Sequence, residues 1–117
     1  MGISNQRKHL RFPELRYAAL KVLHNGSVVN DQGFCLMLDL GQGGCKIRSP
    51  YKVGKGTTVI LDVGFEEEIM TFQGKVRHSM PSGQGGWDLG IEFVDLTPET
   101  RGFLDRILNS SPAPLRD

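Results

Sequence analysis

The chain has 117 residues, of which 38% are hydrophobic and 23% charged, and its formal net charge is +1. These values are typical of one globular domain that needs no disulfide or metal to fold, and they exclude an intrinsically disordered chain. The near-neutral charge also excludes a strongly basic nucleic-acid coat protein, while a local basic patch remains compatible with it.

Local sequence excludes two further classes of protein. No run of residues approaches the roughly 18 apolar positions of a membrane-spanning helix, and the N-terminal residues lack the apolar segment of a secretory signal. Cys35 and Cys45 form no disulfide framework, so we expect them to be free, buried thiols. We therefore expect a cytoplasmic protein without membrane insertion.

Short apolar runs separated by scattered glycines predict an all-β domain. Within these runs apolar and polar residues alternate, as they do in strands that face the core on one side and water on the other. The sequence predicts strands over about residues 15–23, 33–40, 57–63, 69–78 and 87–94, with a short third strand that carries Cys45 and Ile47 on one face.

The second expected strand alternates Phe34, Leu36, Leu38 and Leu40. We assign this row to the buried face, and the strand faces assigned to the core hold most of the aromatic residues of the chain. The acidic residues Glu66–Glu68 are expected at a solvated hairpin tip.

A change to helical spacing marks the C-terminal element. Thr97 is the expected N-cap and Pro98 the first helical residue, where the missing N–H costs no hydrogen bond. A stripe at helical spacing must pack against the sheet, and it consists of Phe103, Leu104, Ile107 and Leu108. The predicted fold is therefore an all-β, six-stranded antiparallel barrel with a C-terminal helix, since closure of the barrel removes exposed edges.

The chain contains no linker between domains. We expect the barrel and helix to span residues 13–109. Residues 1–12 are expected to form a flexible N-terminal arm, and residues 110–117 a flexible tail.

Residues that could catalyse a reaction or bind a metal do not cluster in the sequence. His9, His24 and His78 are far apart, and the two cysteines have no second pair of ligands nearby. The glycine-rich segment of residues 39–44 lacks the Lys-Ser/Thr ending of a P-loop and precedes a strand rather than a helix. We expect no enzymatic activity, no metal and no cofactor.

The segment RKHLR places Arg7 and Arg11 just before the first expected strand. Arginine presents a planar fork of donors that can bind phosphate or a guanine edge bidentately, and it can stack on a base. The pair is also compatible with an ordinary basic N-terminal arm.

The segment DLGQGG begins with Asp39 and contains Gly41, Gly43 and Gly44. Glycine permits positive φ and a close approach of the backbone to a ligand, so backbone N–H groups can point outward. A carboxylate at this position can accept hydrogen bonds from the N–H groups of guanine. The alternative is a glycine-rich hairpin with a capping aspartate.

Together the two segments resemble the PilZ domain family, whose pattern is RxxxR followed by [D/N]xSxxG. The segments GTTVILDV, GKVRH and WDLGIEFVDLTPETRGFL are also similar to the family, and the resemblance covers about residues 6–109. One departure is Gly41, which stands where the family has serine. Glycine at this position lacks the serine hydroxyl group, which removes one hydrogen bond to the ligand with a free energy of about 0.5–1.5 kcal/mol.

The resemblance implies a bacterial, cytoplasmic receptor for the second messenger cyclic di-GMP, acting in motility or biofilm formation. By this resemblance Arg7 and Arg11 bind guanine edges and phosphates, and Asp39 with the turn of residues 41–44 contacts a guanine and its ribose. Ligand binding would order the N-terminal arm, and an unknown downstream protein would sense the new surface. We expect a monomer or a weak homodimer.

Two other functions remain open. One is a PilZ-like adaptor that binds no nucleotide and acts through protein contacts, for example in type IV pilus function. The other is a small barrel that binds single-stranded nucleic acid by stacking and a basic groove. The near-neutral charge and the aromatic residues assigned to the core disfavour it, so we expect neither DNA nor RNA as a partner.

Overall fold

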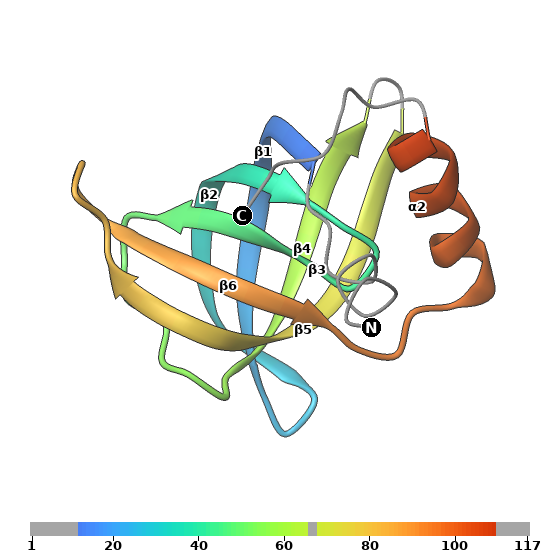
Figure 1. Cartoon of the computed structure of the whole chain (residues 1–117). Coiled ribbons are helices and arrows are strands. Elements are labelled where there is room, and N and C mark those ends of the chain that lie inside the picture. The colour runs from blue at the N-terminus through green and yellow to red at the C-terminus, as the bar shows by residue number, and fades with distance from the viewer. Residues whose placement is uncertain (1–11, 66–67, 110–117) are drawn as a thin grey trace, which may run out of the picture.

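Six antiparallel strands close into a barrel in the order β1-β2-β3-β6-β5-β4, and one helix packs at an end of it (Figure 1). The computed structural model describes residues 12–65 and 68–109 of the chain. The elements are β1 (Phe12–His24), β2 (Ser27–Leu40), β3 (Gly44–Ser49), β4 (Thr58–Phe65), β5 (Glu68–Pro81), β6 (Trp87–Phe93) and α2 (Pro98–Asn109). The predicted fold class is confirmed. The expected arm up to residue 11, the expected tail and residues 66–67 of the acidic tip lie outside the described residues.

The hairpin of β1 and β2 is longer than the sequence predicted. β2 begins at Ser27 instead of near residue 33. Asn25 and Gly26 form the connection, and both have positive φ, 52° and 81°. Two such residues make a hairpin turn whose twist matches that of the flanking strands. The Asn-Gly pair therefore joins two strands directly, and the expected interval between residues 23 and 33 belongs to this hairpin.

The barrel interior is filled by side chains from all six strands and from the helix. Fully or almost fully buried members include Leu20, Met37, Ile47, Leu61, Phe72, Ile91 and Leu104. The predicted alternation is confirmed in β3, β4 and β6, since their apolar residues point into this core at every second position. Inward side chains at every second position leave the intervening residues of each strand on the outer surface.

The predicted inner row of β2 is wrong over most of its length. Cys35 and Met37 face the core, whereas the Phe34 side chain is 75% exposed. Leu40 is buried as predicted, because a register shift between Met37 and Asp39 in the pairing with β3 reverses the faces of the strand. Alternation alone could not assign the face, since both rows of β2 are apolar.

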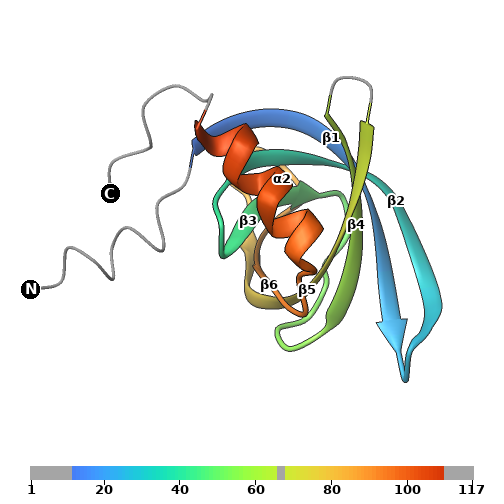
Figure 2. The same cartoon turned by 90° about the vertical axis from the view of Figure 1, so that its right-hand side faces the viewer.

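The helix α2 covers one end of the barrel (Figure 2). The backbone N–H of Thr100 donates to Thr97 Oγ1 at 3.1 Å, which confirms Thr97 as the N-cap. The ring of Phe103 packs edge-on against Phe65 of β4, with 5.1 Å between centroids. The predicted stripe is confirmed, since Phe103 and Leu108 are buried with their apolar neighbours on the helix.

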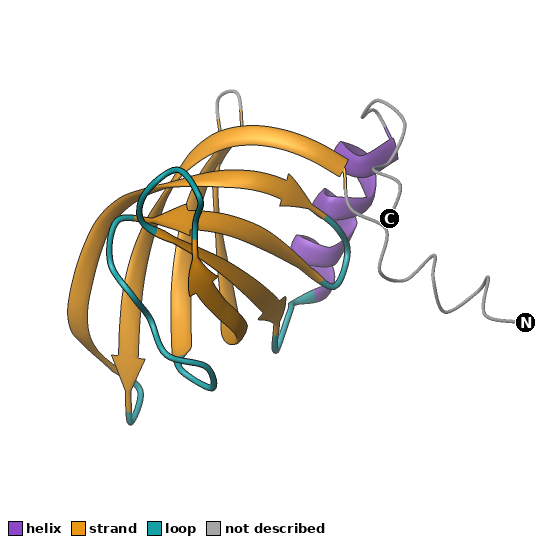
Figure 3. Cartoon of the chain, turned by 60° about the vertical axis from the view of Figure 1, so that its left-hand side comes forward, coloured by secondary structure: helices purple, strands orange, loops and turns teal. Residues whose placement is uncertain are grey.

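The two ends of the barrel differ in what covers them. Figure 3 shows the β2–β3 turn at the end that α2 covers, while the β1–β2, β3–β4 and β5–β6 loops lie away from the helix. Over residues 12–65 and 68–109, no helix has both the length and the apolar character needed to cross a membrane.

Candidate functional site

The start of β1 lies beside the aspartate of the glycine-rich segment. Phe12 pairs with Leu40, and Pro13 pairs with Asp39. Arg7 and Arg11 lie outside the described residues, but the chain that carries them enters β1 at this point. The register of the β1–β2 hairpin therefore places Phe12, which follows Arg11 in the sequence, beside the start of the glycine-rich segment.

The turn of residues 41–44 is closed by backbone hydrogen bonds. The N–H of Gly41 donates to the carbonyl of Gly44 at 2.8 Å, and the N–H of Phe93 donates to the carbonyl of Gly43 at 2.9 Å. The turn is thus tied to the end of β6. Glycines with positive φ in the described part of the chain are Gly26, Gly33, Gly56, Gly85 and Gly86. None of these glycines belongs to the turn of residues 41–44.

Gly44 has a steric reason to be glycine. A Cβ at this position would lie 2.0 Å from the backbone carbonyl oxygen of Ile91. No side chain can be accommodated at that distance, because the neighbouring strand β6 passes directly against the residue. The packing of β3 on β6 is therefore sufficient to explain this glycine without a ligand.

Asp39 begins a row of residues that crosses four neighbouring strands. It pairs with Lys46 of β3, Lys46 pairs with Gly90 of β6, and Gly90 pairs with His78 of β5. A second row, Arg48–Asp88–Met80, runs beside the first on β3, β6 and β5. The two rows form an outward-facing groove of about 270 Å³ lined by Asp39, Lys46, His78, Met80, Asp88 and Gly90. We call it the Asp39 groove.

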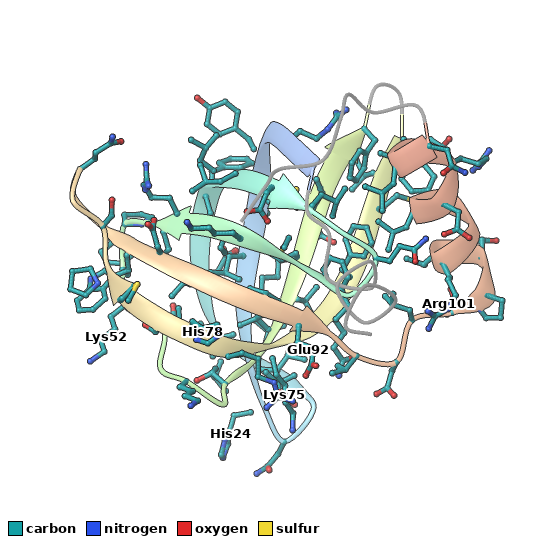
Figure 4. The ribbon with its side chains drawn as sticks, viewed as in Figure 1. His24, Lys52, Lys75, His78, Glu92 and Arg101 are labelled. Carbon is teal, nitrogen blue, oxygen red and sulfur yellow. The ribbon has the colours of Figure 1, made fainter. Side chains whose placement is uncertain are left out.

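The imidazole of His78 covers Gly90 in the floor of the Asp39 groove. A Cβ at residue 90 would lie 3.1 Å from His78 Cδ2, so the ring rests on the glycine backbone. In the pairing of β5 with β6, Val76 and His78 pair with consecutive residues of β6, so Arg77 has no partner residue. This irregularity turns His78 to the outer face (Figure 4). His78 itself is exposed, so one surface of the groove is a planar ring accessible to a ligand.

Charged residues frame the Asp39 groove. Arg48 Nε donates to Asp88 Oδ1 at 2.8 Å and Arg48 Nη2 to Asp88 Oδ2 at 3.3 Å, which makes the ion pair bidentate. The hydrogen bond from Arg48 lowers the pKa of Asp88 against the opposing effect of partial burial, and the charges of Arg48 and Lys46 lower it further. Asp88 is therefore ionised and matched by Arg48, while the exposed ammonium group of Lys46 adds positive charge beside Asp39.

The turn is also linked to the helix. The side-chain amide of Gln42 donates to Asp105 Oδ1 of α2. Asp39 itself is 8% exposed. A nearly buried carboxylate at the end of a strand, followed by a turn held by β6 and α2, is a rigid acceptor at the rim of the groove.

Sequence reasoning missed Lys46 and His78 as candidate site residues. Alternation with the buried Cys45 and Ile47 does place Lys46 outside, but it gives no reason to prefer that side chain over other outward lysines. His78 was treated as an isolated histidine, since the irregular pairing at Arg77 has no recognisable signal in the sequence.

The cysteines are buried as predicted. Burial raises the pKa of the Cys35 thiol, while a hydrogen bond with Ser49 acts in the opposite direction. A protonated, inaccessible thiol is a poor nucleophile and a poor metal ligand. Within residues 12–65 and 68–109, no three His, Cys, Asp or Glu residues come close enough to hold a metal ion.

The Asp39 groove offers an acceptor carboxylate, an ammonium group and a ring surface, which suit a planar, anionic ligand.

Comparison with known proteins agrees with this fold. The chain matches the family model described as "PilZ domain" over residues 5–110. The PilZ domain of YcgR from Escherichia coli, solved with c-di-GMP, has a TM-score of 0.64 at 17% identity, covering 91% of this chain and 92% of that one. The PilZ domain of CeSA from a cellulose-synthesizing bacterium has a TM-score of 0.61 at 15% identity, covering 85% and 94%.

A third similar structure is that of a longer protein. The PlzA protein of Borreliella burgdorferi, in complex with c-di-GMP, has a TM-score of 0.59 at 23% identity, covering 87% of this chain and 40% of PlzA. No curated protein matches the sequence. At these identities the solved structures support the fold alone. The match of the family model extends over nearly the whole sequence, and the chain belongs to the PilZ domain family.

Proposed function

We propose that this protein is a cyclic di-GMP receptor that binds the dinucleotide at the Asp39 groove. One observation carries the proposal: Pro13, two residues after the RxxxR segment in the sequence, pairs with Asp39 at the acidic end of the groove. Similar PilZ proteins that have been solved with c-di-GMP support the choice of ligand.

Each expected contact has a chemical basis. Arg7 and Arg11 supply bidentate donors to phosphates and guanine edges. Asp39 accepts hydrogen bonds from guanine N–H groups, and Gly41 and Gly43 keep side chains away from the purine. Gly44 allows the turn to approach β6 closely. Lys46 adds a charge for the phosphates, and the ring of His78 offers a stacking surface.

The receptor acts without catalysis. Binding orders the arm that precedes β1 over the barrel, and a downstream protein recognises the ordered arm. This signal belongs to a bacterial cytoplasmic pathway that controls motility or biofilm formation.

A second function, a PilZ adaptor that binds no nucleotide, is favoured by one residue. Gly41 lacks the hydroxyl group of the family's serine. Against this, both arginines and Asp39 are retained, and the groove beside Asp39 is open.

Isothermal titration calorimetry with cyclic di-GMP separates the two functions. We expect saturable binding, and Arg7→Ala or Arg11→Ala should each weaken it at least tenfold, or about 1.4 kcal/mol. The matched control is Arg101→Ala, on an exposed position of α2, which should bind like the wild type. Absence of any heat at high protein concentration would favour the adaptor, and unchanged affinity in both arginine variants would move the site elsewhere.

A further inference from the structure

Among the residues whose exposure the structure describes, the three most exposed large apolar ones lie together on the outer surface of the barrel. Tyr17 is 74% exposed, Phe34 75% and Ile69 74%. Single exposed apolar residues are normal, whereas a cluster of large ones on a soluble domain marks a contact surface. These residues do not line the Asp39 groove.

Strand pairing makes the cluster continuous. Leu36 of β2 pairs with Tyr17 of β1, and Phe34 pairs with Ala19. Tyr17 precedes Ala18 on β1 and Gly64 follows Val63 on β4, so the two residues lie next to each other just beyond the last pair of these strands, Ala18–Val63. Gly64 then pairs with Ile69 of β5. The row Leu36–Tyr17–Gly64–Ile69, with Phe34 and Ala19 beside it, is called the apolar patch.

The apolar patch has both projections and a depression. No atom lies within 4 Å of the position that a Cβ would take at Gly64. On one side of this open position stands the ring of Tyr17, and on the other the side chain of Ile69. Neighbouring strands lie about 4.8 Å apart, so Tyr17 of β1 and Ile69 of β5 are roughly 10 Å apart across Gly64 of β4, and the gap accepts one inserted side chain.

Charged residues of both signs border the patch, and several are paired within the chain. Arg16 Nη1 donates to the carbonyl of Gly64 at 3.0 Å, and Glu68, next to Ile69, is exposed. Lys21 Nζ lies 3.5 Å from Asp62 Oδ2, and Arg48 forms its bidentate pair with Asp88. A partner with a large charge of either sign would gain little here. A second copy of the same surface meets little like-charge repulsion. It also carries the projecting ring that fits the depression.

We propose that the apolar patch is the interface of a weak, twofold-symmetric homodimer. An axis that passes between Tyr17 and Gly64 sets each Tyr17 ring over Gly64 of the other copy. The same axis sets Leu36 against Ile69 of the other copy. Such an interface is isologous and closes at two subunits, so it does not form filaments.

The available area limits the strength of this dimer. Large apolar side chains bury on the order of 150–250 Å² each, so three that are three-quarters exposed offer roughly 400 Å² per copy. Two copies together bury about 800 Å² from these residues, less than the 1,200–2,000 Å² of stable interfaces. We therefore expect a concentration-dependent dimer with a Kd of about 10 µM to 1 mM.

Sedimentation velocity of the full chain without nucleotide tests the proposal. The weight-average mass should rise from 13.0 kDa toward twice that value as concentration increases. Tyr17→Lys and Tyr17→Glu should each sediment as monomers, because like charges meet at the axis. Mixing the two variants should restore the dimer, which only an interface between copies explains.

Two further variants keep the test independent of folding. Tyr51→Lys makes the same change at an exposed tyrosine outside the patch and should dimerise like the wild type. Gly64→Gln fills the depression without adding charge and should raise the Kd at least tenfold, with the circular dichroism spectrum unchanged. A wild-type protein that stays monomeric at about 1 mM would overturn the proposal. Equal effects of Tyr17→Lys and Tyr51→Lys, or no recovery on mixing, would overturn it as well.

Discussion

Two outward faces of the same barrel use the same construction for different chemistry. The Asp39 groove is a row across β2, β3, β6 and β5, and the apolar patch is a row across β2, β1, β4 and β5. Each row contains a glycine. His78 covers Gly90 in the first, whereas Gly64 lies open in the second. One barrel can therefore carry a polar surface with an exposed ring and a separate apolar surface, because the outward-facing residues of each strand can differ while the inward-facing residues form one core.

The largest expected effect contrasts two glycines. Gly44→Ala should lower the free energy of unfolding by at least about 3 kcal/mol, because its Cβ would lie 2.0 Å from a backbone oxygen. Gly64→Ala should change it by less than about 1 kcal/mol, in the stabilising direction, since nothing lies near its Cβ. Urea unfolding of both variants measures the contrast. Equal losses would mean that the approach of β6 to Gly44 is misplaced.

The next effect separates the function of Asp39 from its part in the fold. Asp39→Ala should weaken cyclic di-GMP binding at least tenfold, because it removes the acceptor for guanine N–H groups. The competing interpretation, a turn-capping residue, predicts a loss of about 1 kcal/mol in stability instead. Calorimetric affinity and melting temperature measured on one sample distinguish them. A lower melting temperature with unchanged affinity would assign Asp39 to the fold.

A gain of affinity is expected from Gly41→Ser, which restores the family's pattern. The hydroxyl group adds a contact and the substitution stiffens the turn, so affinity should rise about threefold to tenfold. Gly41 is not among the positive-φ residues of the described chain, so serine can adopt its backbone conformation. Titration of this variant beside the wild type gives the ratio. A stable variant with unchanged affinity would show that residue 41 does not face the ligand.

The smallest expected effect concerns the ion pair that frames the groove. The pKa of Asp88 is lowered in the folded protein, so the contribution of the pair is present above the unfolded pKa of an aspartate and is lost as pH falls through the folded value. Asp88→Asn should therefore reduce stability by about 0.5–1 kcal/mol at neutral pH and by less as the solution is acidified below about pH 4. Denaturant unfolding at several pH values measures this. A loss that stays constant into acid would contradict the ion-pair explanation.

Much of the fold could be predicted because local signals agreed with one another. Short alternating runs between glycines marked six strands, and the Thr97–Pro98 pair marked the start of α2. The face of β2 could not be predicted, since both of its rows are apolar and the shift near Leu38 depends on pairing with β3. The apolar patch was hidden for the same reason, because Phe34 had been assigned to the core.

The candidate site was predictable only in part. Asp39 and the glycine turn stand out as a motif, and their place at the start of β1 follows from hairpin register. Lys46 and His78 join Asp39 through the β3–β6 and β6–β5 pairings, which connect residues far apart in the sequence. The steric demand at Gly44 likewise comes from a neighbouring strand and not from the turn that contains it.

Amide NMR spectra recorded during titration with cyclic di-GMP test the central claim most directly. The account predicts that the largest chemical-shift changes fall on Asp39, Lys46, His78 and Gly90, while Tyr17, Phe34 and Ile69 change little. Changes concentrated on the apolar patch would contradict it. So would a spectrum that does not change at saturating nucleotide.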